Sequence, residues 1–349
     1  MTPSTNKTSK TPLVIILAAG LIIIAGLIYA QSLVNQLLLA LFLSIICAQP
    51  IYWMQKKGMS LGLAIAIVLL GMTGIFIGFV EIIGTSVSSF SEDAPMYEQN
   101  LEDMGAEVIA FFNRNGIALT GDKLAGIIVP SKVMGYTAGA LGQLGAVMGN
   151  ALTIFFLFLF LLLELNSITI KARAIVSNTN VSLSYLNSIG HSIRHYLSIK
   201  TATSFLTGLI IWICLLIVGV DYAIIWALIA FLLNYIPNIG SIMAALPAVL
   251  FALIQLGSGG AIWTIIIFVS VNMLVGNVFE PKMMGKGLGL STFIVFFGLI
   301  FWGFILGTVG MFLSVPLTMA IKIILEQNPK TKWIAVILGT DDDARALSE

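Results

Sequence analysis

Charge is the scarcest feature of this 349-residue sequence, because only 9% of its residues are Asp, Glu, Lys or Arg. A soluble domain carries roughly 25%. Hydrophobic residues make up 58% of the chain, and the mean hydropathy is +1.03. Water cannot solvate such a surface, so the composition excludes a soluble enzyme and predicts a membrane protein. A net charge of +1 offers no field for nucleic acid, which we exclude as a partner.

Reactive and metal-binding residues are also few. Cys47 and Cys214 lie inside apolar runs and give neither a disulfide framework nor a zinc spacing. His191 and His195 are four residues apart, but no cysteine or acidic residue nearby completes a metal site. The sequence contains no P-loop, HExxH or GxSxG motif. We therefore predict that the protein is not an enzyme and has no cofactor and no resident metal.

Long apolar runs dominate what is present. A membrane-spanning helix needs about 20 apolar residues, because about 30 Å of hydrocarbon is crossed at 1.5 Å per residue. The sequence predicts an all-α polytopic membrane protein with about eight membrane segments. The first is expected to be a retained anchor, since its apolar core exceeds that of a signal peptide. The eight segments are 13–30, 33–53, 61–84, 145–165, 201–220, 222–257, 261–279 and 290–325.

Two of these segments are too long for one straight span, because each would extend about 54 Å as a helix. Both carry helix breakers near the middle. The run Pro237-Asn238-Ile239-Gly240 interrupts 222–257, and Gly307 to Gly310 interrupts 290–325. A proline follows each break, at Pro247 and Pro316. We predict two broken, re-entrant hairpins that open to opposite sides.

The basic residues set the expected orientation. With both hairpins in place, 14 basic residues lie inside and three lie outside, and both termini are cytoplasmic. Five regions follow from this scheme. They are N-terminal membrane helices (1–84), an extracytoplasmic helical segment (85–144), membrane helices with a cytoplasmic amphipathic helix at 171–200 (145–220), a hairpin-containing transport core (221–326) and a cytoplasmic tail (327–349).

Polar residues inside the membrane are expensive and mark cavities or partners, and here they concentrate in the last third of the chain. Broken helices also expose backbone groups that protein, water or solute must satisfy. The alternative is a kink needed only for packing, with Glu280 either paired to Lys282 or Lys286 or capping a broken helix. The candidate substrate-binding or gating residues are Asn234, Tyr235, Pro237, Asn238, Gly240, Ser241, Asn272, Asn277, Glu280, Pro281, Gly307, Gly310 and Pro316.

Three motifs in this part resemble the autoinducer-2 exporter family, also known as PerM-like permeases. They are NYIPNIGSIMAALPAV (234–249), NVFEPKMMGKGLGLS (277–291) and FWGFILGTVGMFLSVPLT (301–318). The resemblance implies a multi-pass protein of the bacterial cytoplasmic membrane that exports the quorum-sensing signal autoinducer-2, a small polar furanone-type molecule. It also implies a homo-oligomer, for which we expect a pentamer.

Three functions remain open at this point. The first is a secondary exporter of a small polar molecule. The second is a sodium or lithium/proton antiporter, which other family members resemble, although no acidic residue lies at the centre of a predicted span. The third is a non-transporting membrane assembly protein, for which broken hairpins would be unnecessary. The actual solute and any coupling ion are not encoded in the motifs.

Overall fold

The computed structural model consists of helices throughout its described residues, which contain no strand. The described residues are 13–115, 139, 142, 149–164, 167, 171, 183–284, 289–328, 330–340 and 345. The labelled helices are α1 (Leu13–Tyr29), α2 (Gln31–Lys56), α3 (Leu61–Arg114), α6 (Leu183–Val218), α7 (Ala223–Leu233), α8 (Ile239–Leu274), the π-helix η1 (Val275–Phe279), α9 (Glu280–Met284), α10 (Thr292–Glu326) and α11 (Lys332–Leu338).

Five helices in the described part of the chain are long and apolar enough to cross a membrane. Three shorter apolar helices accompany them, at Ala18–Tyr29, Gly149–Glu164 and Ala223–Leu233. The polytopic all-helical class is therefore confirmed. The five long candidates are Gln31–Lys56, Leu61–Glu107, Gly190–Val218, Ile239–Met284 and Thr292–Glu326.

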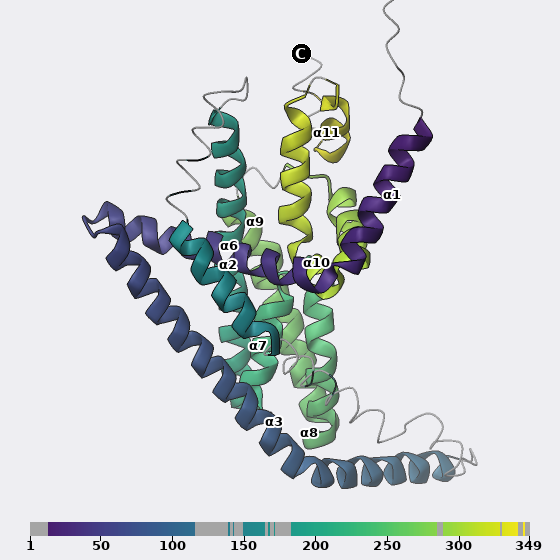
Figure 1. Cartoon of the computed structure of the whole chain (residues 1–349). Helices are drawn as coiled ribbons and strands as arrows, with labels where there is room; N and C mark the ends of the chain where they lie inside the picture. Colours follow the sequence, from purple (N-terminus) through teal and green to yellow (C-terminus); the bar gives the residue numbers. More distant parts are fainter. Residues whose placement is uncertain are drawn as a thin grey trace, which may run out of the picture.

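Two predicted boundaries fall inside continuous helices. α3 runs through the boundary expected at residue 84, and Figure 1 shows it descending and then turning across the lower end of the molecule. α6 runs through the boundary expected at residue 200, so the predicted amphipathic helix and the following span form one helix from Leu183. A helix can continue across the edge of a membrane, so these boundaries stay predictions about where the membrane begins and ends. Most of 116–148 and 172–182 lies outside the described residues.

α8 is two antiparallel arms joined at Gly257, whose φ of 71° and ψ of −162° are non-helical. Ser241 near the start of α8 donates a hydrogen bond to Asn272 near its end, at 2.7 Å. A straight helix would separate these residues by about 46 Å. α7 precedes the first arm and runs antiparallel to it, because Gln255 at the far end of that arm binds the backbone of Asp221 and Gly219 beside the start of α7.

α10 also folds back on itself, at Gly307, where φ is 64° and ψ is −146°. The indole Nε1 of Trp302 in the first arm donates to Oγ1 of Thr318 in the second arm, at 3.1 Å. Ser291 caps the start of the first arm by accepting a hydrogen bond from the Ile294 amide. Both ends of this hairpin lie together, since Lys322 donates to the Gly289 carbonyl at 2.6 Å.

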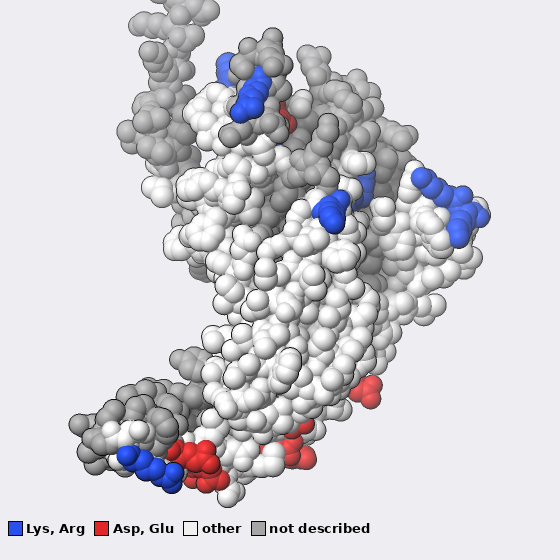
Figure 2. All heavy atoms as spheres, turned by 180° about the vertical axis from the view of Figure 1, so that it is seen from behind, with Lys and Arg blue, Asp and Glu red and all other residues white. Residues whose placement is uncertain are grey.

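Charge divides the molecule into two ends. Figure 2 shows acidic side chains gathered at the lower end, around the second half of α3, and most visible basic side chains at the upper end. We call the end that contains Asp93 and Asp221 the acidic end, and the end that contains Lys322 and Lys330 the basic end. The chain enters the α7–α8 hairpin from the acidic end, and it enters the α10 hairpin from the basic end.

Candidate functional site

The turn between α7 and α8 is held by buried hydrogen bonds to α6. Asn234 is 6% exposed, and its Nδ2 donates to Ser204 Oγ at 3.0 Å. Tyr235 is 3% exposed, and its hydroxyl donates to Thr201 Oγ1 at 2.9 Å. Each bond satisfies a polar group that would be costly in an apolar interior. These two predicted site residues therefore fix the turn in place and leave their polar atoms occupied.

Asn238 closes this turn in a strained conformation. Its φ is 60° and its ψ is −49°, and the Ile239 amide donates to the Pro237 carbonyl at 2.6 Å. This geometry is the rare, strained form of the γ-turn. The Asn238 side chain is exposed and makes no capping bond to α8. Strain of this kind persists only where the surroundings enforce it, and it is often found at functional sites.

The bend of α10 lies against the start of α2 (Figure 1). Asn35 Nδ2 donates to the Leu306 carbonyl at 3.1 Å. A Cβ added at Gly307 would lie 2.7 Å from Gln31 Nε2. Sequence reasoning did not predict this contact, because Gln31 lies between the predicted spans 13–30 and 33–53 and Asn35 lies near the start of the second of them.

An aromatic cluster connects the two breaks. The ring of Tyr235 lies 4.4 Å from that of Phe312 in α10 and 5.5 Å from that of Phe42 in α2, measured between centroids. Phe42 and Phe312 are themselves 4.8 Å apart. Phe312 is five residues beyond Gly307, so the structure brings the two predicted breaks into one core region. This juxtaposition of two interrupted helices is the central geometric feature of the candidate site.

The amides of the second α8 arm are used differently from those of the turn. Asn272 accepts the hydrogen bond from Ser241, which closes the base of the α8 hairpin. Asn277 lies in the π-helix η1, and both Asn277 and Pro281 are exposed. π-Helical turns are rare and are frequently found at functional sites. The structure therefore places Asn272 in a packing contact and Asn277 on the surface.

Glu280 pairs with a residue that the sequence did not suggest. Its two carboxylate oxygens accept hydrogen bonds from Lys200 Nζ of α6, at 2.7 and 2.8 Å. The side chains of Lys200 and Glu280 are 6% and 17% exposed. Lys200 lies 80 positions away along the chain, and only the fold brings it to Glu280. Of the expected partners, Lys282 has no ion pair with Glu280 in the structure, and Lys286 lies outside the described residues.

Three of the predicted site residues are fixed by close backbone packing. A Cβ at Gly240 would lie 1.8 Å from the Leu233 carbonyl oxygen, and one at Gly310 would lie 2.0 Å from the Trp302 carbonyl oxygen. Pro316 is buried inside the second α10 arm. The absence of a side chain at the two glycines allows the hairpin arms to approach each other.

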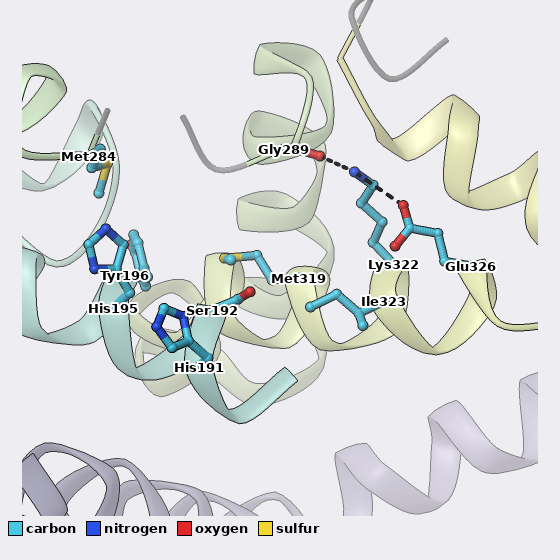
Figure 3. A pocket seen from close by; sticks show the side chains of 10 residues that line it. All are labelled: His191, Ser192, His195, Tyr196, Met284, Gly289, Met319, Lys322, Ile323 and Glu326. Carbon is cyan, nitrogen blue, oxygen red and sulfur yellow. Dashed lines mark hydrogen bonds and ion pairs between the residues drawn. The ribbon is translucent and has the colours of Figure 1, made fainter. Parts of the chain in front are cut away.

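A cavity of about 320 Å³ opens at the basic end between α6 and α10. Figure 3 shows His191 and His195 on one side of it, and Lys322 beside Gly289 and Glu326 on the other. Tyr196 and Met319 also line it and belong to the core cluster that contains Tyr235 and Phe42. The cavity therefore ends at the packed region in which the two breaks meet.

A polar network at the acidic end was not predicted. Tyr97 of α3 donates to the Asp221 carboxylate at 3.0 Å, and Tyr222 donates to Asp93 at 2.6 Å. Asn100 reaches the Ile254 carbonyl near the tip of α8. These contacts fasten the second half of α3 over the α8 hairpin.

Together, the apolar helices and the interrupted hairpins define a polytopic α-helical protein of the transporter class. The sequence matches the model of the AI-2E family transporters over residues 15–330, so the chain belongs to the AI-2E transporter family. It is 34% identical to the AI-2 transport protein TqsA of Escherichia coli K12, over 94% of this chain and 95% of TqsA.

Two further relatives are named as transport proteins. A Haemophilus influenzae protein is 37% identical over 94% of this chain and 96% of its own length. YhhT of Escherichia coli K12 is 33% identical over 97% of each chain. The expected family is therefore confirmed, and a role in membrane transport is supported by all three relatives.

Proposed function

We propose that this membrane transporter is a secondary transporter that exports a small polar molecule, with autoinducer-2 as its solute. The observation that carries the proposal is the meeting of two helix breaks, reached from opposite ends of the molecule, at Phe42, Tyr235 and Phe312. Interrupted helices of opposite orientation are typical of transporters that expose one central site alternately to each side. The printed name of TqsA favours autoinducer-2.

We further propose eight membrane segments in a bacterial cytoplasmic membrane, with both hairpins re-entrant and both termini cytoplasmic. The positive-inside rule supports this orientation, because the basic end then faces the cytoplasm. The cavity beside His195 would then admit solute from the cytoplasm. Cysteines introduced at Lys282 and Lys330 should be labelled only from the cytoplasm, and one at Gly259 only from outside. Labelling of position 282 from outside would refute the orientation.

Transport in proteoliposomes tests the function directly. The purified chain should move the autoinducer-2 furanone down its gradient without ATP. Sodium and proton fluxes should be measured separately in the same vesicles. A wild-type protein that moves neither the furanone nor an ion would favour the third possibility, a membrane assembly protein.

Replacement of Asn238 by Gly tests whether the turn takes part in transport. Glycine adopts a positive φ without strain, so Asn238→Gly removes the side-chain amide group and keeps the backbone turn. Transport should fall at least tenfold at an unchanged or slightly higher melting temperature. Gly74→Ala is the control, because a Cβ at Gly74 meets nothing within 4 Å. Wild-type flux in Asn238→Gly would remove the Asn238 side chain from the site.

The Lys200–Glu280 pair favours one second candidate, a monovalent cation/proton antiporter. A proton or sodium ion that took the place of the Lys200 ammonium would bind the Glu280 carboxylate. Sodium/proton exchange that disappears in Glu280→Gln, without furanone flux in the wild type, would select this alternative.

We also propose a homo-oligomer, with a pentamer as the expected state, on the resemblance alone. Native mass spectrometry of the purified protein measures the number of subunits. A monomer that transports at the wild-type rate would contradict the proposal.

A further inference from the structure

We propose that Gln31 and Asn35 of α2, together with the bend of α10, bind a neutral solute that carries hydroxyl groups. The inference rests on the proposed transport function and names the class of solute that the site accepts. Nothing in the motifs of the last third pointed to α2, whose two amides lie more than 200 positions before the bend.

Unused hydrogen-bonding capacity is the first observation. Asn35 Oδ1 is buried and has no hydrogen-bond partner within the described part of the chain. The Gln31 side chain, half-buried beside Gly307, likewise makes no hydrogen bond to any described residue. A buried amide oxygen without a partner costs free energy. A solute that donates to this oxygen would remove that cost.

The neighbouring amide shows that the free capacity is not shared by every amide of α2. Gln36 lies one residue after Asn35, and its Nε2 donates to Asn150 Oδ1 at 3.0 Å. Gln36 thus has a protein partner on another helix, whereas Gln31 and Asn35 face α10. The three amides lie on the same half of α2, so they form a matched set for comparison.

The polarity of the amides argues against a cation. The atoms that lie nearest the bend are the Nδ2 group of Asn35, which donates to the Leu306 carbonyl, and the Nε2 group of Gln31. Amino groups of amides carry partial positive charge and only donate hydrogen bonds. The Asn35 amino group therefore occupies the Leu306 carbonyl, which would otherwise face a cation at the end of the first α10 arm, and the Gln31 amino group would repel a cation there.

Hydroxyl groups fit the remaining atoms. One hydroxyl both donates and accepts, so it can donate to Asn35 Oδ1 and accept from Gln31 Nε2. Gln31 and Asn35 are both uncharged, and a charged solute would therefore remain unpaired in an apolar region. The chemistry selects a small, uncharged, hydroxyl-bearing molecule, a class that includes sugars and hydrated furanones.

The glycine at the bend keeps the amides close to the backbone. A side chain at position 307 would collide with Gln31, and its backbone angles are in a region that is essentially restricted to glycine. Because the bend is held by one hydrogen bond from Asn35, a solute that bridges both amides would add a second connection between α2 and α10.

The test compares Gln31→Met with Gln36→Met in the full-length protein. Methionine keeps the length of the side chain and removes the amide. Gln31→Met breaks no hydrogen bond to a described residue, so its melting temperature should equal that of the wild type. Gln36→Met loses the bond to Asn150 and should melt earlier. Ligand binding is measured as the ligand-induced rise in melting temperature, with the furanone, ribose and sodium chloride as separate probes.

We expect the furanone to stabilise the wild type and Gln36→Met equally, and to bind Gln31→Met about tenfold more weakly, as the loss of one hydrogen bond predicts. Flux in proteoliposomes should show the same tenfold rise in KM. Binding without flux would refute the transport function and leave the site supported. Equal furanone affinity in Gln31→Met and the wild type, or stabilisation by sodium alone, would overturn the site whatever the flux.

Discussion

The bends of α8 and α10 have nearly the same backbone geometry in different surroundings. Gly257 and Gly307 both combine a positive φ with an extended ψ. A Cβ at Gly257 would meet nothing within 4 Å, whereas one at Gly307 would meet Gln31. The first glycine is required by its conformation alone, and the second by its conformation and by the space that α2 occupies.

The two hairpins also differ in how they are attached. The α8 hairpin is tied to α6 at both ends, by Gln255 at the acidic end and by the Glu280–Lys200 pair just beyond its second arm. The bend of α10 is joined to α2 by one hydrogen bond, from Asn35, and by the packing of Phe312 against Phe42. The comparison identifies α6 and α8 as the fixed part, and α10 as the part that we expect to move during transport.

The largest expected effect is that of Gly307→Ala, which places a methyl group in the bend that packs against Gln31. Alanine in this backbone region costs about 1–3 kcal/mol, and contact with Gln31 adds to that cost. The variant should melt at a lower temperature than Gly257→Ala and should lose most of its transport. A melting scan and a flux assay measure both effects. Normal transport would show that the bend tolerates displacement from α2.

Next in size is Lys200→Met, which removes one attachment of the α8 hairpin. The Glu280 carboxylate then remains largely buried without its partner, which costs on the order of 3 kcal/mol. The double variant Lys200→Met/Glu280→Gln should recover most of that stability, because no unpaired charge remains. Urea or thermal unfolding of the four proteins in the cycle gives the coupling. If the two substitutions changed the free energy of unfolding additively, the Lys200–Glu280 pair would not stabilise the hairpin.

The smallest expected effect is that of Gly257→Ala, at the open bend. Only the backbone cost of about 1–3 kcal/mol applies, because the added methyl group meets no neighbour. Transport per folded molecule should remain at the wild-type level. The difference in stability between the alanine variants at 257 and 307 therefore measures the contribution of the Gln31 contact. Equal losses of stability in Gly257→Ala and Gly307→Ala would show that the Gln31 contact does not distinguish the two bends.

Local sequence signals predicted the positions at which chain direction changes near Pro237 and Gly307. Both lie in apolar runs that exceed the membrane thickness and contain helix breakers, so length and composition were sufficient. The same reasoning placed the end of segment 222–257 and the start of segment 261–279 at the Gly-rich stretch, and the structure has the bend of α8 there, at Gly257. This reasoning predicted helical segments over most of α3 and α6, but it did not predict that each forms one continuous helix.

The contacts of the candidate site were harder to predict from the sequence than the positions of its helix breaks. Apolar periodicity reports which residues are buried, and it carries no information on which distant residue they meet. Lys200 was assigned to the cytoplasmic surface, yet it pairs with Glu280. Asn35 and Gln31 were absent from the candidates, since amides near the start of an N-terminal segment give no local pattern. Only the tertiary structure brings them to α10.

The bond between Asn35 and Leu306 joins residues 271 positions apart. At the usual 5–20 residues per second of protein synthesis, roughly 14 to 54 seconds separate the appearance of the two residues on the ribosome. During that interval the amide of Asn35 has no access to its eventual acceptor. The contact between α2 and the bend of α10 therefore forms late, after the helices between them have been synthesised.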